Sequence, residues 1–360
     1  MMTTLSKISV PKDEPFNCYE VAHVWNPSCK ESAIDIFFDT VISSSKVYAP
    51  FYLISILTRR KFLTLDVFIK YVRDVCTSSL FLSFNTSGFL SLFCLMRQLL
   101  GKFDRKASYL AAAVASYIAI KFERKNRRQA LALYVTNVAS ETLFWMLQSR
   151  GLVRKIPYGD ILLMSISSAV LLLLYRRQKL SGVVPAVLNI MLDKNNDQKK
   201  AELCDCLWRH VFDCDSSKQA LASGFIAGLS ISIYRSPSIS VYLFWKAVEA
   251  LWLQLQEKYP NLNFPQGIEL LYSCSTALLI TAGTLEAHNV RPEYITFLKQ
   301  ITNNRFGTIN RILLDEFSTT QKASTYFPYF FMVSDLEKTS SRYKAILAKL
   351  KNSGLMKYLV

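Results

Sequence analysis

Long runs of residues without a charged side chain constrain this sequence more than any other feature. The longest, 75–96, holds 22 residues between Asp74 and Arg97. Runs of 21 residues at 129–149 and 236–256 contain one and two charged positions. Crossing the hydrocarbon core of a bilayer takes about 17–25 mostly apolar residues in a helix, because every backbone amide must find its partner inside the segment. We therefore interpret these three runs as membrane-spanning helices.

Shorter uncharged runs follow the same pattern. One such run alone is equally consistent with a buried helix of a soluble protein. Seven runs bounded by charged residues are not consistent with buried helices of a soluble protein. The composition agrees, because hydrophobic residues make up 51% of the chain and charged residues only 19%. The sequence thus predicts an all-α, polytopic helical membrane protein. The four shorter runs lie at 107–120, 161–175, 219–234 and 270–285, and an eighth, weakest candidate lies at 47–57.

The runs divide the chain into parts and its charge limits the partners. The 360 residues carry 43 Lys and Arg against 27 Asp and Glu. Basic residues that flank apolar spans suit acidic lipid headgroups, so membrane lipids are the expected partners and nucleic acid is not. The start of the chain lacks the apolar segment of a secretory signal peptide. The predicted parts are a cysteine-containing N-terminal region (1–46), a first membrane module (47–175), a polar linker (176–218), a second membrane module (219–285) and a basic, amphipathic-helical tail (286–360).

An ungapped internal repeat at an offset of 108 residues predicts a duplicated module. Pro157-x-Gly159 recurs as Pro265-x-Gly267. The same offset pairs Arg127 with Arg235, Tyr134 with Tyr242, and Glu141 with Glu249. One period covers three spans, and an odd number inverts the second copy relative to the first. Inverted repeats are typical of secondary transporters, whose sites lie near the membrane midplane.

Each copy of the repeat carries a stripe of three polar residues. Arg, Tyr and Glu are seven residues apart, which places them on one helix face over about 21 Å. An acid inside a span is costly and is a functional candidate by default. The alternative, which we favour, is a helix-packing contact, with Glu249 neutralised by Lys246. Small residues at Gly224 and Gly228 predict close helix packing.

The cysteines and histidines do not predict a metal centre. Cys204, Cys206, His210 and Cys214 resemble a Cys₃His zinc set, but their spacing is not a standard one. Near the N-terminus, Cys18, His23 and Cys29 supply only three potential ligands. We therefore expect no metal or other cofactor. No nucleophilic triad or phosphate-binding loop stands out, so we expect no enzyme.

Short motifs spread over nearly the whole chain form a recognisable set. They are Asn17-Cys18-Tyr19-Glu20, Pro27-Ser28-Cys29, Tyr48-Ala49-Pro50, Leu100-Gly101-Lys102-Phe103, Glu123-Arg124-Lys125, Glu141-Thr142-Leu143-Phe144, Gly224-Phe225-x-Ala227-Gly228, Phe264-Pro265-Gln266, Arg291-Pro292 and Asn310-Arg311. Together they resemble the transmembrane protein 135 family. The resemblance implies a multispan protein of peroxisomal or mitochondrial membranes, whose C-terminal half is similar to Tim17-type translocase components. In that family the linker between the copies is longer, and 176–206 is too short to hold its extra cysteine-rich and hydrophobic sequence.

Two functions follow from these observations. The resemblance implies a regulator of mitochondrial fission–fusion balance, peroxisome organisation and lipid metabolism. It would act through partners such as a dynamin-related protein of the fission machinery or other organelle membrane proteins. The inverted repeat and the intramembrane acids favour the alternative, a carrier or channel for a lipid, solute or polypeptide.

Overall fold

The computed structural model describes residues 16–58, 64–176, 225–226, 228–229, 237–259, 264–311, 313–314 and 332–352. Across these ranges the regular structure is helical and no strand forms, which confirms the all-α prediction. The longer helices are α2 (Cys29–Thr58), α3 (Leu65–Leu100), α4 (Arg105–Ile120), α5 (Lys125–Ser149), α6 (Gly159–Arg176), α10 (Pro237–Lys258), α11 (Gly267–Leu285), α12 (Pro292–Ile301) and α14 (Ser341–Asn352). Shorter turns are α1 (Cys18–Val21), η4 (Ala287–Asn289) and η5 (Arg305–Thr308). The chain forms two compact units, 1–152 with 268–360, and 153–267.

Among the described residues, four helices are long and apolar enough to cross a membrane: α2 as far as Leu57, α3, α5 and α11. Helix α6 is apolar but shorter. These helices support a multi-pass membrane protein. The uncharged run 75–96 is only part of α3, and the run 47–57 is the last part of α2. Most of the run 219–234 lies outside the described residues, so the count of eight spans stays a prediction.

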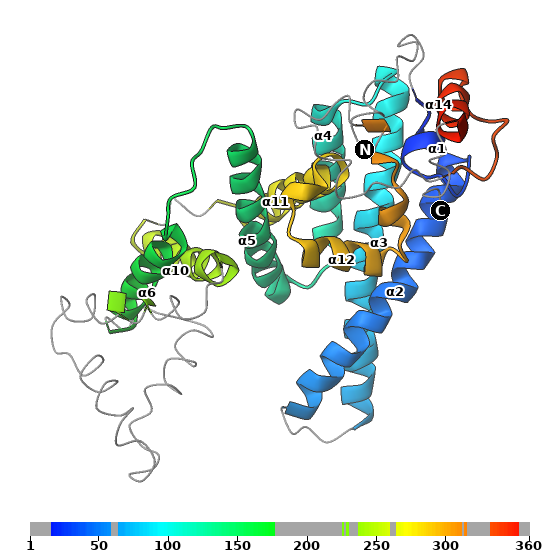
Figure 1. Cartoon of the computed structure of the whole chain (residues 1–360). Helices are drawn as coiled ribbons and strands as arrows, with labels where there is room; N and C mark the ends of the chain where they lie inside the picture. Colours follow the sequence, from blue (N-terminus) through cyan, green and yellow to red (C-terminus); the bar gives the residue numbers. More distant parts are fainter. Residues whose placement is uncertain are drawn as a thin grey trace. The chain divides into compact units, whose positions relative to one another are not determined.

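In the first unit, α2, α3 and α4 pack side by side (Figure 1). Helix α3 ends at Gly101, whose left-handed φ of 70° suits a residue without a Cβ. Asp104 then begins α4, and its carboxylate accepts hydrogen bonds from the backbone N–H groups of residues 106 and 107 at 3.0 and 3.2 Å. A Cβ at Gly88 would lie 3.5 Å from that of Ala115 on α4. Small residues therefore bring these two helices close together.

Helix α11 packs in the first unit although the sequence analysis assigned it to a second module, 219–285. The hydroxyl of Tyr272 is buried and accepts a hydrogen bond from Asn85 of α3 at 3.2 Å. Ser273 donates to the carbonyl of Ala113 of α4 at 2.6 Å. These buried polar contacts, which the sequence spacing does not reveal, place α11 against helices more than 150 residues earlier.

The segment after α11 also packs into the first unit rather than only lying along a membrane face. Helix α12 is amphipathic as expected, but its apolar residues, Tyr294 and Leu298 among them, are buried inside the protein. Asn310 donates its backbone N–H to the carbonyl of Val21 at 2.9 Å. Burial lowers the pKa of the adjacent Arg311 guanidinium to about 9. The predicted amphipathic tail therefore contributes to the protein core.

The second unit contains α6 and α10, which lie in contact. Gly228 packs against α6, because a Cβ at this position would lie 2.2 Å from the Cα of Ser165. Gly224, the other glycine predicted to pack helices, lies outside the described residues.

Local structure repeats where the sequence predicts a duplication. Helices α6 and α11 begin at Gly159 and Gly267, 108 residues apart. The residue before each start has a left-handed backbone, with φ of 62° at Tyr158 and 65° at Gln266. These matches are what the repeat predicts, and the duplication of a whole inverted module stays a prediction.

Candidate functional site

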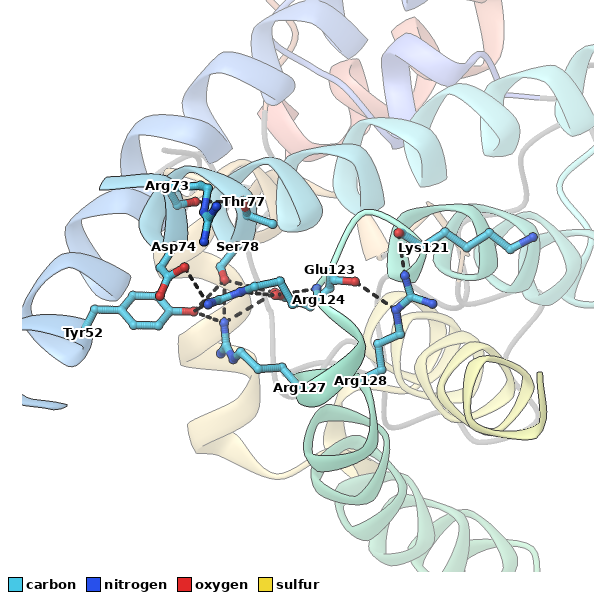
Figure 2. Close-up of polar contacts among 10 residues, drawn as sticks. All are labelled: Tyr52, Arg73, Asp74, Thr77, Ser78, Lys121, Glu123, Arg124, Arg127 and Arg128. Atoms are coloured by element: carbon cyan, nitrogen blue, oxygen red, sulfur yellow. Dashed lines mark hydrogen bonds and ion pairs between the residues drawn. The ribbon is translucent and has the colours of Figure 1, made fainter. Parts of the chain in front are cut away.

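The turn between α4 and α5 buries the carboxylate of Glu123 inside the first unit (Figure 2). Its side chain has 0% exposure. Ser78 of α3 donates its hydroxyl to Glu123 Oε2 at 3.0 Å, and the backbone N–H of Arg124 donates to Oε1 at 3.0 Å. The guanidinium of Arg127 lies 3.4 Å from Oε2. A buried charge is tolerated only with such pairing. The Glu123 carboxylate therefore has a structural role.

Two arginines extend this network to the neighbouring helices. Arg124 forms an ion pair with Asp74 of α3 at 2.6 Å and donates to the hydroxyl of Tyr52 of α2 at 2.8 Å. Arg127 donates to the same hydroxyl, and its guanidinium lies over the ring of Tyr48 at 5.7 Å. Figure 2 shows Asp74, Ser78 and Tyr52 converging on the two arginines. The network thus joins α2, α3 and the start of α5.

Arg128 connects the same turn to α11. Its guanidinium pairs with Glu269 at 2.8 Å, and it also donates to the carbonyls of Lys121 and Glu123 at 2.7 and 2.9 Å. Those carbonyls follow the end of α4, where the backbone acceptors have no partner inside the helix. We name the set Asp74, Glu123, Arg124, Arg127, Arg128 and Glu269 the first charged layer.

A second charged layer lies at the other ends of the same helices and consists of Arg105, Arg150 and Glu286. The Glu286 side chain is 1% exposed and pairs with Arg150 and, at 3.6 Å, with Arg105. At 1.5 Å per residue, Glu269 and Glu286 are about 26 Å apart along α11. Arg128 and Arg150 are about 33 Å apart along α5. These spacings match a hydrocarbon core of about 30 Å.

The residues of the predicted stripe are distributed over both units. Arg127 belongs to the first charged layer, whereas Tyr134 is half exposed and Glu141 pairs with Arg291 just before α12. In the second unit, Glu249 pairs with Lys246 at 2.8 Å and Tyr242 is exposed. Arg235 lies outside the described residues. Each acid therefore has a basic partner within its own unit, and the choice between a packing contact and a functional site stays a prediction.

A cluster of cysteine and histidine side chains joins the starts of α1 and α2 to the C-terminal part of α3. Cys18, His23, Cys29 and Cys94 each place one possible ligand atom within 4.8 Å of the others. All but Cys29 are buried, and the three cysteines are free thiols. We name these four residues the Cys₃His cluster. Cys204, Cys206, His210 and Cys214 lie outside the described residues.

Three members of this cluster, Cys18, His23 and Cys29, could be recognised in the sequence as potential ligands, but Cys94 could not. That residue lies 65 positions after Cys29 on a helix interpreted as a span, so spacing gives no reason to group it with the others. The charged layers were missed for the same reason, because Glu123 and Glu269 look like ordinary flanking charges. Only the packing of α3 and α11 brings these residues to their partners.

Comparison with known proteins identifies the part of the chain that holds most of these residues. Residues 15–147 match the family model described as the N-terminal cysteine-rich region of Transmembrane protein 135. The matched segment includes the whole Cys₃His cluster and most of the first charged layer. No solved structure matches the chain.

Proposed function

Residues 15–147 place the chain in the transmembrane protein 135 family, and from that premise we propose that it is an integral protein of the peroxisomal or mitochondrial membrane that acts through partners. The processes that we assign to it are mitochondrial fission–fusion balance, peroxisome organisation and lipid metabolism. Its partners would be other organelle membrane proteins or a dynamin-related protein of the fission machinery. We propose no catalytic step.

The pairing of the buried acids supports an action through partners over an action as a carrier. Glu123, Glu141 and Glu286 each contact at least one arginine of the first unit. A carboxylate that binds cargo has to exchange its partner, whereas these three connect helices. Paired in this way, the helices form a scaffold that presents its loops and termini to other proteins.

The number of spans predicted from the sequence fits the two charged layers. Helix α5 ends beside Arg150 at the second layer, and α11 begins beside Glu269 at the first. With the two layers at the two faces of the membrane, we expect the chain between them to cross the membrane an odd number of times. The three runs predicted at 161–175, 219–234 and 236–256 supply that number.

A carrier remains the second candidate, favoured by the repeated helix starts at Gly159 and Gly267. Glutamine at Glu141 or Glu249 separates the two functions, because it keeps the shape and removes the charge. For a scaffold we expect each variant to be tolerated. Glu141→Gln should cost about 0.6 kcal/mol, the average for an interhelical contact. Glu249→Gln should cost about 0.2–0.5 kcal/mol, because its partner Lys246 lies three residues earlier on the same helix. For a central transport site, each single variant would abolish function, and the double variant would be little worse.

The readouts are organelle morphology in cells that lack the native protein and cargo movement in reconstituted vesicles. Mitochondrial length, peroxisome number and neutral-lipid content should be restored by both variants as well as by the unchanged protein. Glu257→Gln, at an exposed position of α10, is the matched control. Loss of rescue by Glu141→Gln and Glu249→Gln at normal protein level, together with transport of a lipid or solute, would replace the scaffold by the carrier.

A further inference from the structure

The Cys₃His cluster gathers its four residues from three separate elements. Cys18 is the first residue of α1 and Cys29 the first residue of α2, with His23 in the turn between them. Cys94 comes from the last two turns of α3. Three cysteines and one histidine within 4.8 Å are far from a random surface grouping, because Cys18, His23 and Cys94 are also buried.

We propose that Cys18, His23, Cys29 and Cys94 together bind one Zn²⁺ ion. Structural zinc sites are closed, tetrahedral and built from cysteine and histidine, and Cys₃His is one of their standard sets. With Zn–S bonds of about 2.3 Å, neighbouring sulfurs of such a site lie roughly 3.8 Å apart. The cluster therefore needs to contract by about 1 Å at most. A two-iron cluster would divide the ligands between two metal atoms and separate them further.

The imidazole of His23 supplies an independent observation that points to a ligand. Its Nδ1 lies 2.7 Å from the carbonyl oxygen of Asn26, to which it donates when protonated. This contact selects the tautomer whose Nε2 carries a lone pair. That Nε2 is buried and has no hydrogen-bond partner among the described residues. Metal-binding histidines characteristically donate their other ring N–H in this way, so the contact with Asn26 orients His23 as a ligand.

A basic residue next to the cluster would compensate the negative charge of the zinc-bound site. Three thiolates and one Zn²⁺ carry a net charge of about −1, since each thiolate contributes one negative charge. Arg97 follows Cys94 by three residues on α3. Its guanidinium donates to the carbonyl of Phe16 at 2.8 Å and to the side chain of Asn17 at 3.3 Å. A fixed positive charge therefore lies beside the thiolates and stabilises them.

The ion would hold together the two ends of the described chain. Residues 18–21, which the cluster anchors to α3, contact the C-terminal segment directly. The hydroxyl of Tyr19 lies 2.8 Å from that of Ser334, and Asn310 donates its side chain to the carbonyl of Glu20 at 2.6 Å. The metal is thus a structural staple at the face of the protein where both segments meet.

Metal analysis of the full chain tests this site. The protein, purified in detergent without chelators, should contain one zinc per chain and no stoichiometric iron. Cys94→Ser should lower the zinc content at least tenfold. Cys206→Ser is the matched control and should leave the content unchanged, because we expect no zinc in the other Cys₃His set. Cys76→Ser, at an exposed cysteine, controls for the loss of any thiol.

Several results would overturn the proposal. These are unchanged protein free of zinc, zinc that survives Cys94→Ser, zinc that is lost with Cys206→Ser, and iron with visible absorbance. If Cys94→Ser does not fold, cobalt exchange into the unchanged protein decides. A tetrahedral site with three thiolates gives intense sulfur-to-cobalt absorption and visible ligand-field bands, whereas a protein without the site gives neither.

Discussion

Replacing Glu123 by alanine is expected to destabilise the first unit by about 3 kcal/mol. Removing one partner of a buried ion pair costs about 3–5 kcal/mol, because the remaining charge stays buried without compensation. Arg124 and Arg127 are about one third exposed, which places the cost at the lower end of that range. The Ser78 hydroxyl also loses its acceptor. The free energy of unfolding in detergent, measured by chemical denaturation, gives the value directly.

Two further variants serve as controls for the Glu123→Ala measurement. Glu123→Gln keeps a hydrogen-bond acceptor for Ser78 and removes only the charge, so it should fall between the unchanged protein and the alanine variant. Glu293→Gln, at an exposed position in the first turn of α12, should cost less than about 1 kcal/mol. Equal stability of the Glu123→Ala and Glu293→Gln proteins would show that the first charged layer does not hold the helices together.

Removing zinc from the Cys₃His cluster should destabilise the protein by nearly as much as Glu123→Ala does. This effect should be confined to one face of the first unit. At a free zinc concentration of about 100 times Kd, binding adds about 2.7 kcal/mol to the folded state. A chelator should therefore raise the hydrogen-exchange rate of backbone amides at 18–23, and with them those at 334–340, which they contact. Amides of α11 facing α3 should keep their protection.

The chelator experiment also tests whether the ion joins the N-terminal and C-terminal segments. Returning zinc to the depleted protein should restore protection at 18–23 and 334–340 together. Protection that is unaffected by the chelator, although zinc has left the protein, would contradict the role of the ion in joining the two segments. Cys94→Ser should reproduce the depleted pattern without chelator, and Cys76→Ser should not.

Elements whose cause is local could be predicted from the sequence. The apolar runs at 75–96 and 129–149 need only their own composition to indicate helices, and α3 and α5 contain them. The paired starts at Gly159 and Gly267 followed from the repeat.

Elements whose cause is packing could not be predicted. The partner of Glu123 on α3, Ser78, lies 45 residues away, and that of Arg128, Glu269, lies 141 residues away. Neither separation follows a helical period. Cys94 was missed in the same way. For Glu249, the sequence also indicated the partner Lys246, three residues earlier, and the structure contains this pair. For Glu141, only the contact with Arg291, 150 residues later, shows how the charge is compensated.

The central claim is that the two charged layers lie at the two faces of a membrane. This predicts opposite sides for positions 102 and 126, which lie at exposed sites beside the second and first layers. Single cysteines there can be introduced into a protein that keeps Cys18, Cys29 and Cys94 and lacks the other five. An impermeant maleimide added to sealed organelles should label only one of Lys102→Cys and Asn126→Cys, and permeabilisation should expose the other. Tags at both termini should share the side of position 102. Labelling of both cysteines from the same side of intact membranes would contradict the account.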